Sequence, residues 1–352
     1  MISETLHPPG FIRFCLTLLL GLGVSGCFGS TTIPSVPAFL IVVNNAVTGL
    51  VEYPLPLATG STPLFSLAAA GTYEGGVTVQ NDLFIFGKDS GNVPSLWRYT
   101  LPLSKSPSPM QLTGFQGTPV AALSLSGGQY VVFLEKTGSS QACLEGFTAG
   151  GLISTGASTL PSPVLACTSS TFSLPGSFQG GTMQLSGNGS TLVIETTYQN
   201  SGVNQTTMQA FSTGTLMNSP FPPATATHAL SGTLSTFPVE GAAESNNVLL
   251  LLPNPSAPAV DFFEMTSIQS GSNQVSPLTQ NSLSGIPLFP LLVLDPFGSF
   301  VYMATTQGGS SSPTIYSFSL NAIQNSSNAA PFAQVGTGLN PVALLTVVGS
   351  QG

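Results

Sequence analysis

Short hydrophobic stretches separated by turn residues follow one another along almost the whole chain. Residues 83–86, 130–134, 192–194 and 248–252 are strongly apolar, and Gly, Asn, Asp or Pro flank each of them. Weaker stretches between them alternate apolar and polar positions, which is typical of half-buried strands. No stretch after residue 24 shows a convincing helical period. The pattern predicts an all-β protein.

A proline that opens a short apolar stretch recurs at positions 63, 109, 163, 220, 277 and 331, at intervals of 46 to 57 residues. Between these prolines the same order returns: an X-Gly pair, a moderately apolar strand, a turn, the most apolar strand, a loop and an alternating strand. Repeats of this length, built of short strands, are typical of β-propellers. We therefore expect one propeller of six four-stranded blades. A seventh remains an alternative, because residues 150–177 and 222–237 could hold further strands.

The two ends of the repeat region complement each other. Residues 342–348 form a first strand with nothing after it, whereas residues 39–43 and 49–53 form second and third strands with no first strand before them. Joined, they make one more unit. Such closure removes exposed sheet edges, so we expect the C-terminal strand to pair with the N-terminal ones.

The sixth unit carries a family resemblance. Residues 295–305 read Asp-Pro-Phe-Gly-Ser-Phe-Val-Tyr-Met-Ala-Thr and resemble the Asp-Pro-x-Gly-x-Phe-Val-Tyr-Val-Ala-Asn signature of lactonase-like β-propellers with Tyr-Val-Thr-Asn repeats. The Ser219-Pro220-Phe221 element is similar to their inter-blade linker. The resemblance implies a propeller, seven-bladed in most members, and some members hydrolyse phosphogluconolactone. It supplies no catalytic residue for this chain, because His, Arg and Lys are scarce.

The N-terminus has the features of an export signal. Arg13 precedes the apolar run 14–24, which is too short to span a bilayer. Val24-Ser25-Gly26-Cys27 then resembles the bacterial lipoprotein signal, and an ordinary signal peptide is the alternative. We expect a signal peptide over 1–26, a lipid on Cys27 that makes the bilayer a partner, a flexible tether over 27–36 and the propeller over 37–352. Phe28, where retained lipoproteins carry Asp, favours the outer membrane.

Two further cysteines remain in the propeller region, Cys143 and Cys167. An even pair in an oxidising compartment predicts a disulfide. The chain has no Cys-x-x-Cys, so zinc or thioredoxin-like redox chemistry has no support.

Charge is unusually sparse. Charged residues make up 5% of the chain, with five Lys and Arg and a formal net charge of −8. Because a phosphate backbone needs cations to bind it, this composition excludes nucleic-acid binding. Neither Lys nor Arg occurs after Lys136, which argues against a site for a phosphorylated sugar.

The residue before each recurring Gly is the best candidate for a ligand site. If these residues start the innermost strands, they form a polar ring around a central channel, consisting of Glu74, Gln116, Gln179, Glu240, Ser284 and Thr337. Such a ring could take a divalent cation or hydrogen-bond a glycan; otherwise it holds water. Glu244 is a weaker candidate that could act together with Glu240. His228 is predicted to lie in a surface loop.

Two functions stay open. The first is a binding or scaffold lipoprotein that presents its channel or loops to an envelope protein or glycan. The second is a lactonase-like hydrolase that uses Glu74, Glu240 and a metal ion in the channel. A hydrolase requires carboxylates that converge in the channel, whereas a scaffold is expected to have a channel of Ser, Thr and apolar side chains.

Overall fold

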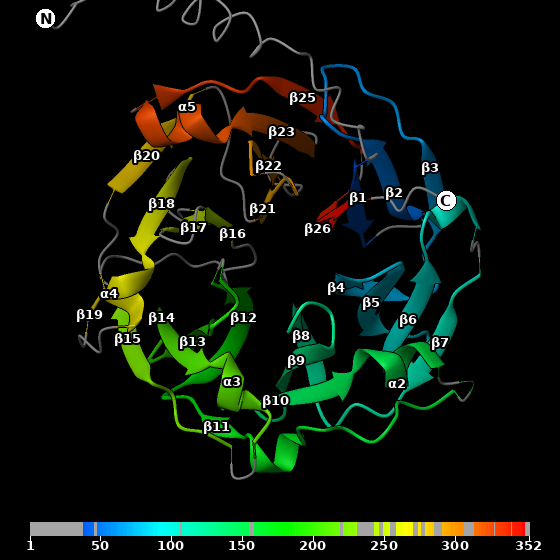
Figure 1. Cartoon of the computed structure of the whole chain (residues 1–352), viewed down its shortest axis with the longest axis vertical. Coiled ribbons are helices and arrows are strands. Elements are labelled where there is room, and N and C mark those ends of the chain that lie inside the picture. The colour runs from blue at the N-terminus through cyan, green and yellow to red at the C-terminus, as the bar shows by residue number, and fades with distance from the viewer. Residues whose placement is uncertain are drawn as a thin grey trace, which may run out of the picture. The chain divides into compact units, whose positions relative to one another are not determined.

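Six β-sheets are arranged in a ring around a central axis (Figure 1). The structure is a computed structural model. It describes residues 38–45, 48–105, 108–154, 156, 158–186, 188–218, 221–230, 243–245, 249–253, 258–269, 274–275, 279–284, 291–296, 298–305, 313–326, 328–338 and 340–348. The signal peptide over 1–26, the tether over 27–36 and Cys27 lie outside the described residues, so this division of the chain stays a prediction.

Each sheet is one blade, and its strands are named from the innermost outward. The blades are β26 (Pro341–Val348), β1 (Ala38–Asn44), β2 (Thr48–Pro54) and β3 (Phe65–Ala68); β4 (Thr72–Val79), β5 (Asp82–Lys88), β6 (Pro94–Thr100) and β7 (Met110–Thr113); β8 (Thr118–Leu125), β9 (Tyr130–Lys136), β10 (Gln141–Thr148) and β11 (Phe172–Ser173); β12 (Ser177–Leu185), β13 (Thr191–Asn200), β14 (Val203–Ser212), β15 (Ala226–Leu230) and β19 (Gln274–Val275); β16 (Ala243–Ser245), β17 (Leu249–Pro253), β18 (Ala259–Glu264), β20 (Thr279–Leu283) and β24 (Asn328–Ala329); and β21 (Leu291–Leu294), β22 (Phe300–Ala304), β23 (Thr314–Ser319) and β25 (Ala333–Gly336).

Within each blade the four main strands are antiparallel, and the two-residue strands β19 and β24 add parallel fifth strands to two blades. The helices described are all short: η1 (Leu103–Lys105), α2 (Ala149–Ser154), η2 (Cys167–Ser169), α3 (Thr213–Leu216), α4 (Met265–Gln269) and α5 (Leu320–Asn325). The prediction of a six-bladed, all-β propeller is confirmed. The described part of residues 150–177 contributes α2, η2 and β11 and no seventh sheet.

The ring closes as predicted. β26 pairs antiparallel with β1, with Ile41 opposite Leu345 and Val43 opposite Ala343. The last described strand is therefore the innermost strand of the blade that the first described strands build. Because this pairing joins residues some three hundred positions apart, it holds the two ends of the repeat together.

Short links between blades fix the direction of the strands that they join. β7 ends at Thr113 and β8 begins at Thr118, and β3 and β4 are linked as briefly. A link of a few residues cannot cross the height of a blade, so β4, β8, β12 and β26, which follow such links, begin at the end where the preceding outer strand finished. We call this end, where β4, β8 and β12 begin, the distal face. The opposite end is the proximal face, where β1 begins at Ala38.

The hydrophobic core lies in layers between neighbouring blades. Ile41 and Val43 of β1 pack in one cluster with Ile85 of β5 and Trp97 of β6. Trp97 is buried, and its ring meets that of Tyr73 edge-on at 5.2 Å between centroids. The single tryptophan therefore packs the blades rather than serving as a ligand platform. Among the described residues, no helix has both the length and the hydrophobicity required to cross a membrane.

Candidate functional site

A cavity of about 600 Å³ lies at the centre of the ring. Its described walls come from five of the six innermost strands, namely β4, β8, β12, β21 and β26. The wall is mostly apolar or glycine, as in residues 120–123, 291–293 and 342–345. The polar side chains that line it are Asn45, Tyr73, Glu74, Thr78, Ser124, Gln179, Thr182, Gln184 and Thr346.

β-Bulges place two of the predicted ring residues in this wall. The pairing of β4 with β5 shifts between Tyr73 and Gly75, so Glu74 is the extra residue of a bulge. The pairing of β12 with β13 shifts in the same way around Gln179. A bulge leaves its extra residue outside the ladder and re-aims the side chain. The recurring X-Gly pair is thus a bulge in these two blades.

Glu74 is engaged by a cation at the distal face. The Nζ atom of Lys88 lies 3.2 Å from the Oε1 atom of Glu74, and both side chains are about one-third exposed. The pairing follows from register, because Lys88 ends β5 opposite Thr72 at the start of β4. Glu74 is the one carboxylate among the described residues that line the cavity. A hard divalent cation takes six or more oxygen ligands, so the described wall offers a poor donor set for it.

The remaining ring residues are not gathered in the described wall. The exposed Gln116 lies in the link before β8. Ser284 follows the outer strand β20, where its N–H donates to the carbonyl of Ala329, and Thr337 follows the outer strand β25, where its N–H donates to Pro313. Glu240 lies outside the described residues. Glu244 lies on β16, for which the structure describes the backbone only. A ligand role for the ring stays a prediction.

The backbone of the innermost strands also belongs to the wall. Each of these strands is the edge of its sheet and has one hydrogen-bonded neighbour, so part of its N–H and C=O groups is directed toward the cavity. Gly75-Gly76 and Gly180-Gly181 line the cavity, which leaves this backbone accessible. The arrangement offers neutral donors and acceptors on an apolar background. That chemistry suits a polar, uncharged ligand.

The sequence pattern did not predict that several carboxylates are buried inside the blades. Glu135 on β9 and Glu145 on β10 are both buried and interact with each other. Burial raises the pKa of Glu135, and the neighbouring Glu145 raises it further. Burial also raises the pKa of Glu145. Two carboxylates in contact cannot both ionise in an apolar layer, so the pair holds a proton at neutral pH.

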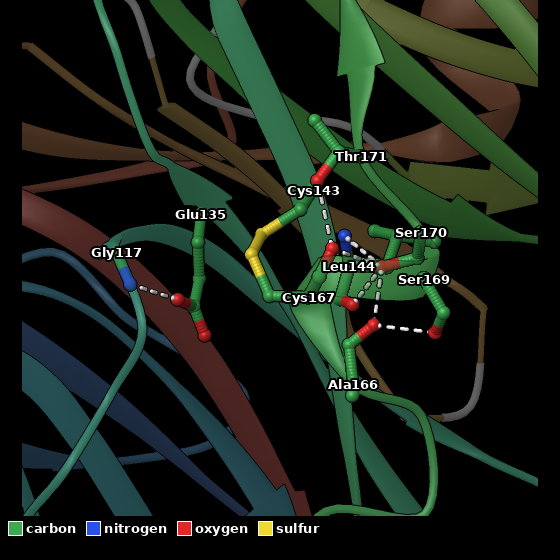
Figure 2. Close-up of a disulfide and its surroundings, with 9 residues drawn as sticks. All are labelled: Gly117, Glu135, Cys143, Leu144, Ala166, Cys167, Ser169, Ser170 and Thr171. Atoms are coloured by element: carbon green, nitrogen blue, oxygen red, sulfur yellow. Dashed lines mark hydrogen bonds between the residues drawn. A yellow bond between two sulfur atoms is a disulfide. The ribbon is translucent and has the colours of Figure 1, made fainter.

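This acid pair holds the link that leads into β8. The Oε2 atom of Glu135 accepts a hydrogen bond of 2.6 Å from the N–H of Gly117 (Figure 2). Glu145 accepts one from the N–H of Gln116. The two buried carboxyl groups thus hold the backbone of Gln116 and Gly117, which are the X-Gly pair of this blade. Glu135 and Glu145 therefore have a structural role, and neither of them lines the cavity.

Glu195 on β13 is the most isolated of the buried acids. It is buried, and neither of its carboxyl oxygens has a hydrogen-bond partner in the described part of the protein. Burial raises its pKa to about 8. Glu52 on β2 is also buried, and burial raises its pKa against the lowering effect of a hydrogen bond from the Leu103 backbone. An isolated buried acid stays protonated at neutral pH.

The predicted disulfide is confirmed. Cys143 on β10 is bonded to Cys167 in η2, and the two Cα atoms lie 5.2 Å apart. Figure 2 shows the bridge beside Glu135, one of whose carboxyl oxygens lies within 4.8 Å of both sulfur atoms. The Oγ atom of Ser170 accepts a hydrogen bond from the N–H of Leu144, and the hydroxyl of Thr171 donates one to the carbonyl of Cys167, which fixes the chain around η2. The disulfide holds the long segment between β10 and β11 against its blade.

His228 corrects a prediction. The residue lies on β15 rather than in a surface loop, and it is fully buried. Its Nε2 atom lies 2.6 Å from the carbonyl oxygen of Ile268 in α4. The preceding polar residues obscured the short alternating strand in the sequence. A buried histidine away from the cavity gives no support to a catalytic role.

Known structures share this fold at low sequence identity. A Bacteroides fragilis protein named as a 6-phosphogluconolactonase has a TM-score of 0.53 and 12% identity, with 90% of this chain and 100% of that chain covered. The Pseudomonas aeruginosa periplasmic gluconolactonase PpgL gives 0.51 and 14%, with 85% and 83% covered. Kuenenia stuttgartiensis hydrazine synthase gives 0.51 and 11%, with 76% and 77% covered.

No protein-family model and no curated protein matches the chain. The neighbours include lactonase-like propellers, and at these identities the likeness shows the propeller fold alone. The expectation drawn from residues 295–305 therefore holds at the level of fold.

Proposed function

We propose that this protein is an exported lipoprotein whose propeller binds an uncharged, hydrogen-bonding partner in its central channel. The observation that carries the proposal is the chemistry of the described wall. It combines apolar residues, glycine pairs and neutral polar side chains, and its one carboxylate is paired with Lys88. An envelope glycan or a protein segment has the matching chemistry, because both present neutral donors and acceptors along a chain.

The hydrolase alternative has less support. The names of two structural neighbours contain lactonase activities, yet the acids with raised pKa values, Glu135 and Glu195, are buried away from the cavity. A catalytic acid must reach its substrate. The described part of the channel offers only Glu74 for that task.

Export and lipid attachment are supported by the sequence of residues 13–27 and by the disulfide, since such bridges persist in oxidising compartments. The test is the Cys27→Ser variant expressed in a Gram-negative host. We expect wild type to incorporate labelled palmitate and to sediment with the outer membrane, and the variant to lose the label. A label that persists in the variant would refute the lipoprotein proposal.

Channel binding is tested with neutral oligosaccharides of increasing length, titrated calorimetrically into the full-length protein. Ala122 on β8 lines the cavity and is half-buried, so Ala122→Phe should narrow the cavity and weaken binding. Val203→Ser, at an exposed turn outside the cavity, is the matched control and should bind as wild type does. Heats that Ala122→Phe leaves unchanged, or no binding by any oligosaccharide, would contradict a glycan-binding channel.

A further inference from the structure

The recurring Pro-apolar element of the sequence places a large exposed hydrophobic residue on successive blades. Leu64 is 54% exposed, Met110 37%, Val164 45% and Phe332 66%. Each directly follows one of the repeat prolines. We call these four residues the rim. They are four of the six large hydrophobic side chains that are exposed in the described part of the protein.

The rim residues occupy equivalent positions. Leu64 donates its N–H to Glu52, Val164 to Gly146 and Phe332 to Ser317, and Met110 pairs with Arg98. In each blade the partner lies two residues before the end of the third strand, as the bounds of β2, β6, β10 and β23 show. Third strands end at the proximal face. The rim therefore follows the edge of that face over four consecutive blades, near the circumference of the propeller.

The chain enters the propeller at the same face. β1 and β3 are both antiparallel to β2, so Ala38 and Leu64 lie at the same end of their blade. Ala38 lies eleven positions after Cys27, with ten residues between them. A flexible linker of that length has a root-mean-square reach of about 18 Å. A lipid on Cys27 would hold the proximal face close to the bilayer.

Among the described side chains of the proximal face, charge is largely buried or neutralised. Asp82 and Asp295 are buried, and Arg98 is paired with Asp82 at 2.7 Å. Glu264, at the end of β18, is half-buried and is the exception among the described side chains there. The distal face carries Glu74 and Lys88 together with the exposed Lys136. The distal face therefore carries exposed charge, which a lipid surface disfavours, whereas the described side chains of the proximal face carry little.

We propose that the rim docks the proximal face against the lipid bilayer, so that the polar mouth of the channel points away from the membrane. The inference rests on the proposed lipid anchor and adds an orientation to it. Apolar side chains at an interface enter the headgroup and acyl boundary, and four spaced contacts would resist tilting of the propeller. The ligand site is then presented to the envelope space.

The test uses tryptophan as a depth probe in the full-length acylated protein, reconstituted in phosphatidylcholine vesicles with brominated acyl chains. Neutral lipid is chosen because an acidic protein is repelled by anionic lipid. Trp97 is buried and supplies a constant background that wild type measures. Phe332→Trp and Met110→Trp probe two blades of the rim. Val203→Trp is the matched control, because Val203 is 60% exposed at the distal β13–β14 turn.

We expect the rim tryptophans to be quenched by brominated lipid at least about twofold more than Trp at position 203, because bilayer contact buries them by about 5–10 Å. Acrylamide should quench the control more strongly. Equal quenching at all three positions in protein that floats with the vesicles would overturn the orientation alone. Protein that does not float would overturn the anchor and the orientation together. A blue shift at position 332 that grows with protein concentration without vesicles would assign the rim to a second copy of the chain instead.

Discussion

Acidic residues occupy two contrasting environments in this propeller. Glu74 lies at the mouth of the channel, is accessible and is paired with Lys88. Glu135, Glu145 and Glu195 lie inside the blades, are buried and face no cation in the described structure. The acid that a substrate could reach is thus neutralised by a salt bridge, whereas the acids with raised pKa values are out of reach. A raised pKa in this protein marks burial and not a catalytic site, although such shifts often mark active sites.

The largest effect that is independent of pH is expected from removing the disulfide beside Glu135. The bridge closes a sequence separation of 24 residues, which is worth about 3 kcal/mol in the chain-entropy account. Cys143→Ser/Cys167→Ser should lower the free energy of unfolding by that amount in urea denaturation. Reductant should lower the midpoint of wild type and leave that of the double variant unchanged. A wild-type midpoint insensitive to reductant would contradict the bridge.

Glu195→Gln should change how stability depends on pH. The folded protein keeps the Glu195 proton up to about pH 8, whereas the unfolded chain releases it near pH 4.5. The stability that this proton supplies is present in full below pH 4.5 and is lost as pH rises toward 8, by up to about 1.4 kcal/mol per pH unit. Glu195→Gln should flatten the wild-type slope between pH 5 and 8.

Met208→Leu is the control for that experiment. Met208 lies opposite Glu195 on β14, so the substitution perturbs the same packing without altering charge. Its unfolding free energy should follow a curve parallel to the wild type. If Glu195→Gln also ran parallel, the carboxyl group would be ionised or solvated in the folded protein.

Glu135 and Glu145 should behave as one unit. Either Glu135→Gln or Glu145→Gln removes the interaction between the two carboxyl groups, so the double variant should gain little over the single ones. Groups coupled this closely show non-additive effects of at least about 1.4 kcal/mol. Unfolding measured at pH 6, 7.5 and 9 gives the double-mutant cycle. Additive changes at all three pH values would show that the two carboxyl groups do not interact.

The smallest stability effect is expected at the mouth. Glu74→Gln removes a partly exposed ion pair, which contributes about 0–1 kcal/mol. Lys88→Met removes the other partner and should cost a similarly small amount, and 1 M salt should weaken the wild type to the level of the variants. A loss beyond about 2 kcal/mol would place Glu74 with the buried acids.

The fold was predictable because short strands and turn residues alternate over the whole chain. The C-terminal residues 342–348 and the N-terminal residues 39–43 lacked complementary partners, and ring closure supplied them. The two cysteines of the propeller region, Cys143 and Cys167, left one pairing. These features follow from local sequence patterns, and tertiary contacts reinforce them.

The site was less predictable, because a bulge or a link of variable length is not visible in a pattern of apolar positions. Glu74 and Gln179 reach the cavity through bulges, whereas Ser284 and Thr337 continue outer strands. The buried acids were missed because a glutamate within an apolar strand reads as a solvent-facing position. Its burial depends on the neighbouring blade, which the local sequence does not encode.

The most direct test of the contrast is hydrolysis of glucono-1,5-lactone by wild type and Glu74→Gln, followed from pH 6 to 8 with and without added Ca²⁺ or Mn²⁺. The account predicts that both proteins leave the spontaneous rate unchanged under every condition. A wild-type rate above the spontaneous one that Glu74→Gln abolishes would show that the accessible acid is catalytic and would contradict the account.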